Sequence, residues 1–165
     1  MKKTATISDD GLYRYVLGRR WSDEEDAFAT FVMLNPSTAD AEVDDPTIRR
    51  CISFAQSWGM GGLRVVNLYA LRATRPEALW NVADPVGPEN DYYLTWIADM
   101  AKATGWPLVA AWGANAKQGR VQDVLGLRWM QFSLQCLGIT KAGAPRHPLY
   151  VKGATPLIPW APPTT

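Results

Sequence analysis

The chain has 165 residues, of which 47% are hydrophobic and 20% charged, a composition typical of one globular domain and not of a disordered or collagen-like chain. Its 17 Lys and Arg balance 16 Asp and Glu, and this net charge of +1 argues against a protein that coats nucleic acid through a general basic field. One histidine excludes a His-rich metal site, and two cysteines exclude a Cys-only zinc or four-cysteine iron–sulfur site within one chain.

Five apolar segments are predicted as β-strands. In chain order they are residues 13–17, 29–34, 63–67, 108–112 and, with the weakest pattern, 133–137. The third and fourth are short and almost wholly apolar, which is typical of strands covered on both faces of a sheet.

Three helices are predicted between these strands. Asp45 followed by Pro46 indicates a capped helix start, and Gly59 marks the end of the apolar spacing that follows. A second helix begins near residue 88 and ends at Gly105, and a third covers about 116–125. Strands that alternate with helices of this size predict an α/β fold with a mostly parallel sheet.

The whole chain, residues 1–165, is predicted to form a single domain. Residues 156–165 are rich in proline and are expected to form an extended tail that lies on the body of the protein. No segment approaches the roughly 20 apolar residues of a membrane-spanning helix. Ser8-Asp9-Asp10 stands where a signal peptide would be apolar. We therefore expect a cytoplasmic protein that does not bind membranes, with Cys51 and Cys136 reduced and buried.

Polar and aromatic side chains follow the predicted strands, at the edge where ligands bind in sheets of this kind. They are Asn35, Ser37, Thr38, Asn67, Tyr69, Trp112, Arg146 and His147. Each has an ordinary alternative, since Asn-Pro-Ser is a common turn, a strand-end asparagine often satisfies backbone groups, and Trp112 suits a core. An amide carries both a donor and an acceptor, so it can read the edge of a nucleobase.

The same loops carry a resemblance to a known family. Leu34-Asn35-Pro36-Ser37-Thr38-Ala39-Asp40, Asp44-Asp45-Pro46-Thr47, Asn67-Leu68-Tyr69-Ala70-Leu71-Arg72, Trp112-Gly113 and Arg146-His147-Pro148-Leu149-Tyr150 closely resemble the family named domain of unknown function 1643. The resemblance covers about residues 12–158 and supplies no established activity.

A more distant resemblance is more informative about chemistry. The order Asn-Pro-Ser, Asn-Leu, Trp-Gly, His-Pro is similar to the uracil-DNA glycosylase superfamily. It implies a three-layer α/β/α sandwich with a short, mostly parallel central sheet. It also implies that Asn35 positions the attacking water, Asn67 reads the base and His147 stabilises the departing base.

The sequence departs from that superfamily at several positions. Ser37 stands where uracil-specific members place a tyrosine that excludes 5-substituted pyrimidines, so a larger or modified base is expected. The loop from Thr38 to Asp45 lacks the usual aromatic residue that stacks on the base, and Tyr69 or Trp112 are the candidates to replace it. His147 and Pro148 precede Leu149, so the element that probes the DNA groove is altered.

Charged residues near these loops leave alternatives open. The acidic group is Asp40, Glu42, Asp44 and Asp45. It either holds Mg²⁺, which prefers oxygen ligands, or caps a helix and faces solvent. The basic residues are Arg72, Arg75, Lys117, Arg120, Lys141, Arg146 and Lys152. They either hold a nucleotide or a short strand, or keep the surface soluble.

Three functions remain open from the sequence. The first is an N-glycosidase that hydrolyses the base–sugar bond of a modified base in DNA or in a nucleotide, without a metal or cofactor. Its catalytic residues would be Asn35 and His147, and its substrate-binding residues Ser37, Thr38, Asn67, Tyr69, Trp112 and Arg146. The second is a binding module for a nucleotide or nucleic acid on the same fold, without catalysis. The third is a metal-dependent phosphohydrolase that uses the acidic group.

Overall fold

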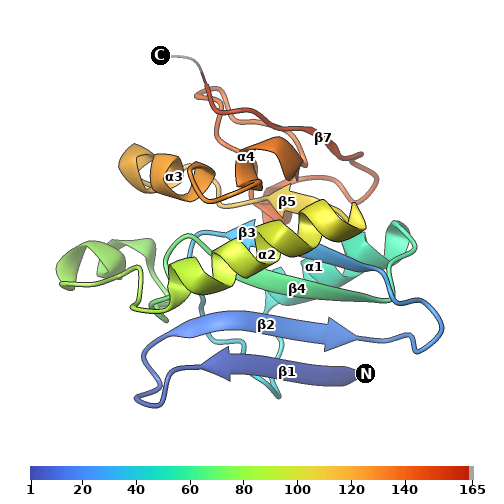
Figure 1. Cartoon of the computed structure of the whole chain (residues 1–165), viewed down its shortest axis with the longest axis horizontal. Helices are drawn as coiled ribbons and strands as arrows, with labels where there is room; N and C mark the ends of the chain where they lie inside the picture. The colour runs from blue at the N-terminus through green and yellow to red at the C-terminus, as the bar shows by residue number, and fades with distance from the viewer. Residues whose placement is uncertain (164–165) are drawn as a thin grey trace.

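A mixed sheet of seven strands forms the centre of the computed structural model, which describes residues 1–163 (Figure 1). The order across the sheet is β1-β2-β4-β3-β5-β6-β7. The strands are β1 Lys2–Ile7, β2 Arg14–Arg20, β3 Phe28–Met33, β4 Gly62–Asn67, β5 Leu108–Ala110, β6 Leu134–Cys136 and β7 Ile158–Pro159.

The prediction of a mostly parallel sheet is correct for the centre and wrong for the edges. Strands β4, β3, β5 and β6 are parallel to one another, whereas β1, β2 and β7 join by antiparallel pairing. The sequence pattern predicts no strand before residue 13, yet β1 is there. Its side chains alternate between exposed and half-buried, because this edge strand has only one covered face.

Helix α1 (Pro46–Ser57) covers one face of the sheet and begins as predicted. The Asp45 side chain accepts a hydrogen bond from the Ile48 backbone N–H at 2.9 Å, and Pro46 occupies the first turn. The helix ends before Gly59, which adopts a left-handed φ of 75°. Its buried face, which includes Ile48 and Phe54, packs against the sheet in one core cluster.

Helices α2 (Asn90–Thr104), α3 (Gln118–Leu125) and α4 (Met130–Ser133) cover the opposite face. Alternate residues of β3 show the two sides of the sheet, since Phe31 belongs to the core under α1 and Val32 to the core under α2. Helices therefore lie on both faces of the sheet. Two short 3₁₀ helices, η1 (Pro76–Asn81) and η2 (Pro148–Tyr150), lie in the loops that follow β4 and β6.

The proline-rich tail is docked on the body through part of its length. Strand β7 pairs with β6, and the buried Trp160 meets the Trp112 ring edge-on at 5.0 Å. Residues 164–165 of the predicted tail lie outside the described residues. Both cysteines are buried free thiols, as predicted. None of the described helices is long and apolar enough to cross a membrane.

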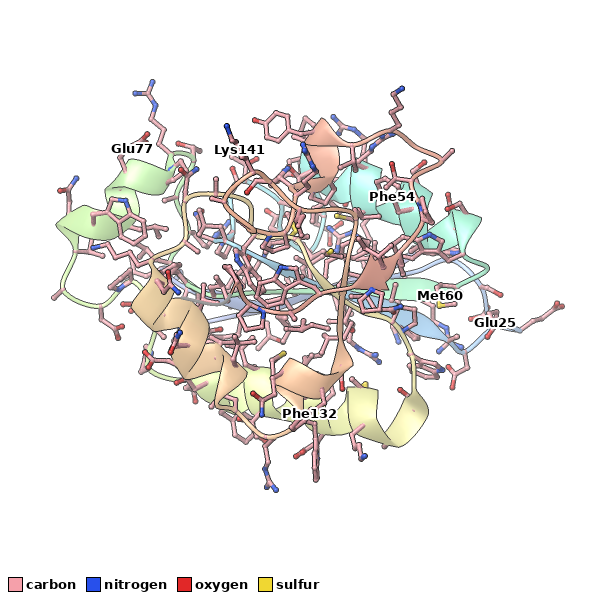
Figure 2. All side chains as sticks on the ribbon, turned by 90° about the horizontal axis from the view of Figure 1, so that it is seen from above. Glu25, Phe54, Met60, Glu77, Phe132 and Lys141 are labelled. Atoms are coloured by element: carbon pink, nitrogen blue, oxygen red, sulfur yellow. The ribbon has the colours of Figure 1, made fainter. Side chains whose placement is uncertain are left out.

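The path of the chain opens a crevice at one edge of the sheet. From β3 the chain passes through α1 to β4 on one side, and it then returns through α2 to β5 on the other side of β3. After β5 the chain continues through α3 and α4 to β6, on the side of β5 away from β3. The loops after the neighbouring strands β3 and β5 therefore leave the sheet in opposite directions, and α/β proteins bind ligands between two such loops. In Figure 2 the segments around Glu77 and Lys141, which follow β4 and β6, lie at the same edge of the molecule.

Candidate functional site

A cavity of about 530 Å³ lies at the carboxyl ends of the parallel strands, and we name it the strand-end cavity. Its volume falls within the range that holds a small organic ligand. The predicted residues that line it are Asn35, Ser37, Asn67, Trp112, Arg146 and His147. They come from the ends of four strands that are far apart in the sequence.

Two of the predicted binding residues do not line the strand-end cavity. Thr38 is exposed on the loop after β3. Tyr69 is buried in the core beneath α2 and α3, where its hydroxyl accepts a hydrogen bond from the Lys117 backbone N–H at 3.3 Å. Because Tyr69 faces away from the cavity, Trp112 is the candidate that remains to contact a base.

Asn67, the last residue of β4, is the most unusual side chain of the cavity. It is only 1% exposed, and neither its Nδ2 nor its Oδ1 has a hydrogen-bond partner among residues 1–163. An unsatisfied buried polar group costs about 1–3 kcal/mol. An amide held in this state beside a cavity is therefore prepared to pair with a ligand that supplies both a donor and an acceptor.

The backbone at Asn67 is held firmly even though its side chain is not. The Asn90 side chain donates from Nδ2 to the carbonyls of Asn67 and Leu68 at 2.9 and 3.2 Å, and Arg120 donates from Nε to the Leu68 carbonyl at 2.8 Å. Arg120 also pairs with Asp91 at 2.7 Å. Arg120, expected at the rim of the site, is instead a buried residue that fixes the end of β4.

His147 enters the cavity from the loop before η2. Its Nδ1 accepts a hydrogen bond from the Leu149 backbone N–H at 3.2 Å, which places the proton of the neutral imidazole on Nε2. Burial lowers the pKa of His147 below its ordinary value, with a smaller opposing effect from Asp45. The imidazole is therefore a neutral N–H donor at neutral pH.

Asn35 links the loop after β3 to the loop after β4. Its Nδ2 donates to the carbonyls of Pro36 and Ala73, both at 2.9 Å, and the Ala73 N–H donates to the Pro36 carbonyl. Both side-chain donations use Nδ2, so Oδ1 is the atom of this amide that a water molecule or ligand can meet. Asn35 thus combines a structural role with one remaining acceptor.

Arg14 also lines the cavity. The prediction of an apolar strand at residues 13–17 did not identify Arg14 as a site residue. The residue is 2% exposed, and its Nη1 donates to the Ala39 carbonyl at 2.6 Å. Its Nε has no partner within the described chain. Burial lowers the pKa of Arg14 to about 10, with Asp45 opposing, so the guanidinium stays charged at neutral pH. A charged residue within an otherwise apolar strand is the signal that could have identified it.

The acidic group is occupied by structural interactions. Asp40 accepts hydrogen bonds from the backbone N–H groups of Glu42 and Val43, which closes a turn and lowers its pKa. Asp44 pairs with Arg19 at 2.7 Å, and Asp45 caps α1. No group of three or more His, Cys, Asp or Glu residues placed to hold a metal occurs in residues 1–163.

Replacement of Asp45 by alanine is expected to lower the free energy of unfolding by about 1 kcal/mol, because α1 loses its N-cap. Urea unfolding with and without Mg²⁺ measures this change. The matched control is Glu42→Ala, which removes an exposed side chain of the same group and should leave stability unchanged. Stabilisation of the wild type by Mg²⁺, lost in Asp45→Ala, would instead show a metal site.

The comparisons with known proteins identify one family. The family described as Protein of unknown function (DUF1643) matches residues 14–149, which include all the residues that line the strand-end cavity except Tyr150. The search of curated proteins returns no match. The search of solved structures returns none either.

Proposed function

Since the chain belongs to the family described as Protein of unknown function (DUF1643), whose description names no activity, we propose its function from the strand-end cavity. The proposed function is an N-glycosidase that recognises a modified nucleobase and hydrolyses its bond to the sugar, in DNA or in a nucleotide. The observation that carries the proposal is the buried amide of Asn67, with both polar atoms unpaired among residues 1–163.

Asn67 supplies the recognition step. Its Nδ2 donates and its Oδ1 accepts, a combination that matches the edge of a nucleobase that carries a carbonyl beside an N–H. The nearby ring of Trp112 adds an aromatic surface to the same cavity. Ser37, also in the lining, is small and leaves room for a substituent on the base.

His147 and Asn35 supply the chemical step. The transition state resembles an oxocarbenium ion, with negative charge developing on the departing base, and the Nε2–H of His147 would donate a hydrogen bond to a base oxygen there. The Oδ1 of Asn35 would accept a hydrogen bond from the water that adds to the sugar carbon. The bond between the sugar carbon and the base breaks as the water oxygen bonds to that carbon, and the proton that the water loses ends on the departing base. The products are the protonated, neutral free base and a sugar that carries a hydroxyl. The resemblance of these loops to the uracil-DNA glycosylase superfamily supports the same roles.

A second candidate is a binding module that recognises the same ligand without cleaving it. The structural bonds that Asn35 makes to Pro36 and Ala73 favour it, because they explain this residue without a catalytic role. An amide is also a much weaker base than a carboxylate.

The test is to incubate the protein with oligonucleotides and nucleotides that carry varied modified bases and to measure released base by mass spectrometry. We expect release from at least one substrate and its loss in Asn67→Leu. The control Asn81→Ala, an exposed asparagine outside the cavity, should behave as the wild type. A ligand-induced thermal shift without release would support the binding module. No release and no shift from any base would overturn both.

A further inference from the structure

A second hollow, distinct from the strand-end cavity, lies between α2 and the strands β1, β2 and β4, and we name it the β1–β2 groove. It encloses about 400 Å³ and shares no lining residue with the strand-end cavity. Figure 1 shows α2 lying over the middle of the sheet, with β1 and β2 extending beyond its edge. The lining residues that matter here are Lys2, Arg20, Phe28, Arg64, Tyr92 and Trp96.

Aromatic rings of α2 form one wall of the groove. Tyr92 is 72% exposed and Trp96 is 42% exposed, and a spacing of four residues places both on one face of the helix. Tyr93, the neighbour of Tyr92, meets it edge-on at 5.2 Å. Large rings exposed side by side in a groove present flat apolar faces that suit stacking with a planar ligand.

Arg64 provides a half-buried cation at the floor of the groove. Its guanidinium lies 4.2 Å from the centre of the Phe28 ring and 5.7 Å from that of Trp96. Its Nη1 donates a hydrogen bond to the Met100 sulfur at 3.1 Å, and within residues 1–163 it forms no ion pair with a carboxylate. Burial lowers the pKa of Arg64, and Asp26 opposes this shift. A desolvated charge without an ion-pair partner is favourably placed to meet an anion.

The remaining charges of the groove are also positive. Lys2 is exposed, and Arg20 pairs at 3.8 and 3.3 Å with Asp23 and Asp26, both of which are strongly exposed. Such surface pairs contribute little and are readily exchanged for a phosphate. Arg19 is already engaged by Asp44. Among the residues described, no Asp or Glu lines this groove.

We propose that the β1–β2 groove binds a single strand of DNA, with phosphates against Lys2, Arg20 and Arg64 and bases stacked on Tyr92 and Trp96. Aligned cations and exposed rings are the combination that single-strand binding uses. A duplex hides the faces of its bases from such rings, and an acidic peptide would leave the rings unused. The choice of DNA as the ligand rests on the proposed function. Binding of DNA in the groove implies that the substrate of the strand-end cavity is a polymer and not a free nucleotide.

The test measures the fluorescence anisotropy of a labelled oligothymidylate of about 12 nucleotides with the full chain, enough to span one binding site. Tyr92→Ser should weaken binding by about 10- to 100-fold, because one stacked base is lost. Lys2→Gln should weaken binding less than Tyr92→Ser does. It should also reduce by about 1 the slope of the logarithm of the affinity against the logarithm of the salt concentration. The matched control is Phe132→Ser, since Phe132 is 77% exposed on α4, outside both hollows.

Three outcomes would overturn the proposal. Unchanged strand binding by Tyr92→Ser contradicts the groove as the binding site. Tighter binding of oligouridylate or of an acidic peptide contradicts the choice of DNA. Loss of strand binding in Asn67→Leu but not in Tyr92→Ser would place the strand in the strand-end cavity alone. Strand binding through the groove without base release from any substrate would leave this proposal standing and remove the proposed function.

Discussion

Replacement of Asn67 by leucine is expected to raise the free energy of unfolding by about 1–3 kcal/mol and to weaken base binding by about 10- to 100-fold. The two polar atoms of the Asn67 amide are buried without hydrogen-bond partners among residues 1–163. Their removal therefore stabilises the ligand-free protein. Leucine keeps the branching at Cγ but cannot pair with a base. Urea unfolding and ligand-induced thermal shifts measure the two effects.

Asn90→Leu is the matched comparison for Asn67→Leu. Asn90 is equally buried, but its Nδ2 donates to the Asn67 and Leu68 carbonyls, so its replacement should destabilise the protein. Asn67→Ala is a second variant that avoids any clash from the larger leucine side chain. If both Asn67 variants destabilise the protein as Asn90→Leu does, the amide of Asn67 serves the fold and not a ligand.

Replacement of His147 by alanine is expected to lower the rate constant of base release by about 10²–10³-fold with little change in KM. The reason is that the Nε2–H donor would act on charge that exists only in the transition state. His147→Gln, which retains an N–H donor, should recover part of the rate. Single-turnover measurements on the best substrate separate the chemical step from binding. A loss confined to KM would make His147 a binding residue.

The lowered pKa of His147 also predicts the dependence of rate and stability on pH. The neutral imidazole is the form held by the Leu149 N–H, so the rate should be constant above pH of about 6.5 and should fall as pH decreases through the lowered pKa. Below pH of about 6.5 the unfolded chain binds the proton more readily than the native protein, so the free energy of unfolding falls as well. His147→Ala removes both effects, and a rate that rises on acidification would contradict them.

Helices α1, α2 and α3 were predictable from the sequence because their signals are local, whereas the short helix α4 was not predicted. The Asp45 cap, the Pro46 that follows it and the glycine at position 59 act within one turn of α1, and Gly105 ends α2 in the same way with a φ of 70°. The edge strands were not predictable. Strand β1 pairs with β2 and the two residues of β7 pair with β6, and neither segment has the continuous apolar run that marked the central strands.

The candidate site was predictable in part for the same reason. A strand followed by a polar residue is a local pattern, and it identified Asn35, Asn67 and His147. All three line the cavity at the carboxyl ends of the parallel strands. It misassigned Tyr69, because the direction of a side chain just beyond a strand depends on which core it meets. It missed Arg14, because β2 reaches the cavity only through antiparallel pairing with β4.

Length, composition and charge by themselves indicated a globular protein without a His-rich or Cys-only metal site and without a general basic field, and the alternation of strand and helix patterns indicated an α/β fold. Only the tertiary structure decided how the few charges and amides are used. It left the Asn67 amide unpaired among residues 1–163, while Asn90 and Arg120 hold the carbonyls of Asn67 and Leu68. It also placed Lys2, Arg20 and Arg64 together in the β1–β2 groove, whose described lining contains no Asp or Glu. The physical reason is that hydrogen bonds and local charge depend on partners that lie many residues away in the sequence. Composition counts these residues without their positions, and a local pattern covers only a few neighbouring residues.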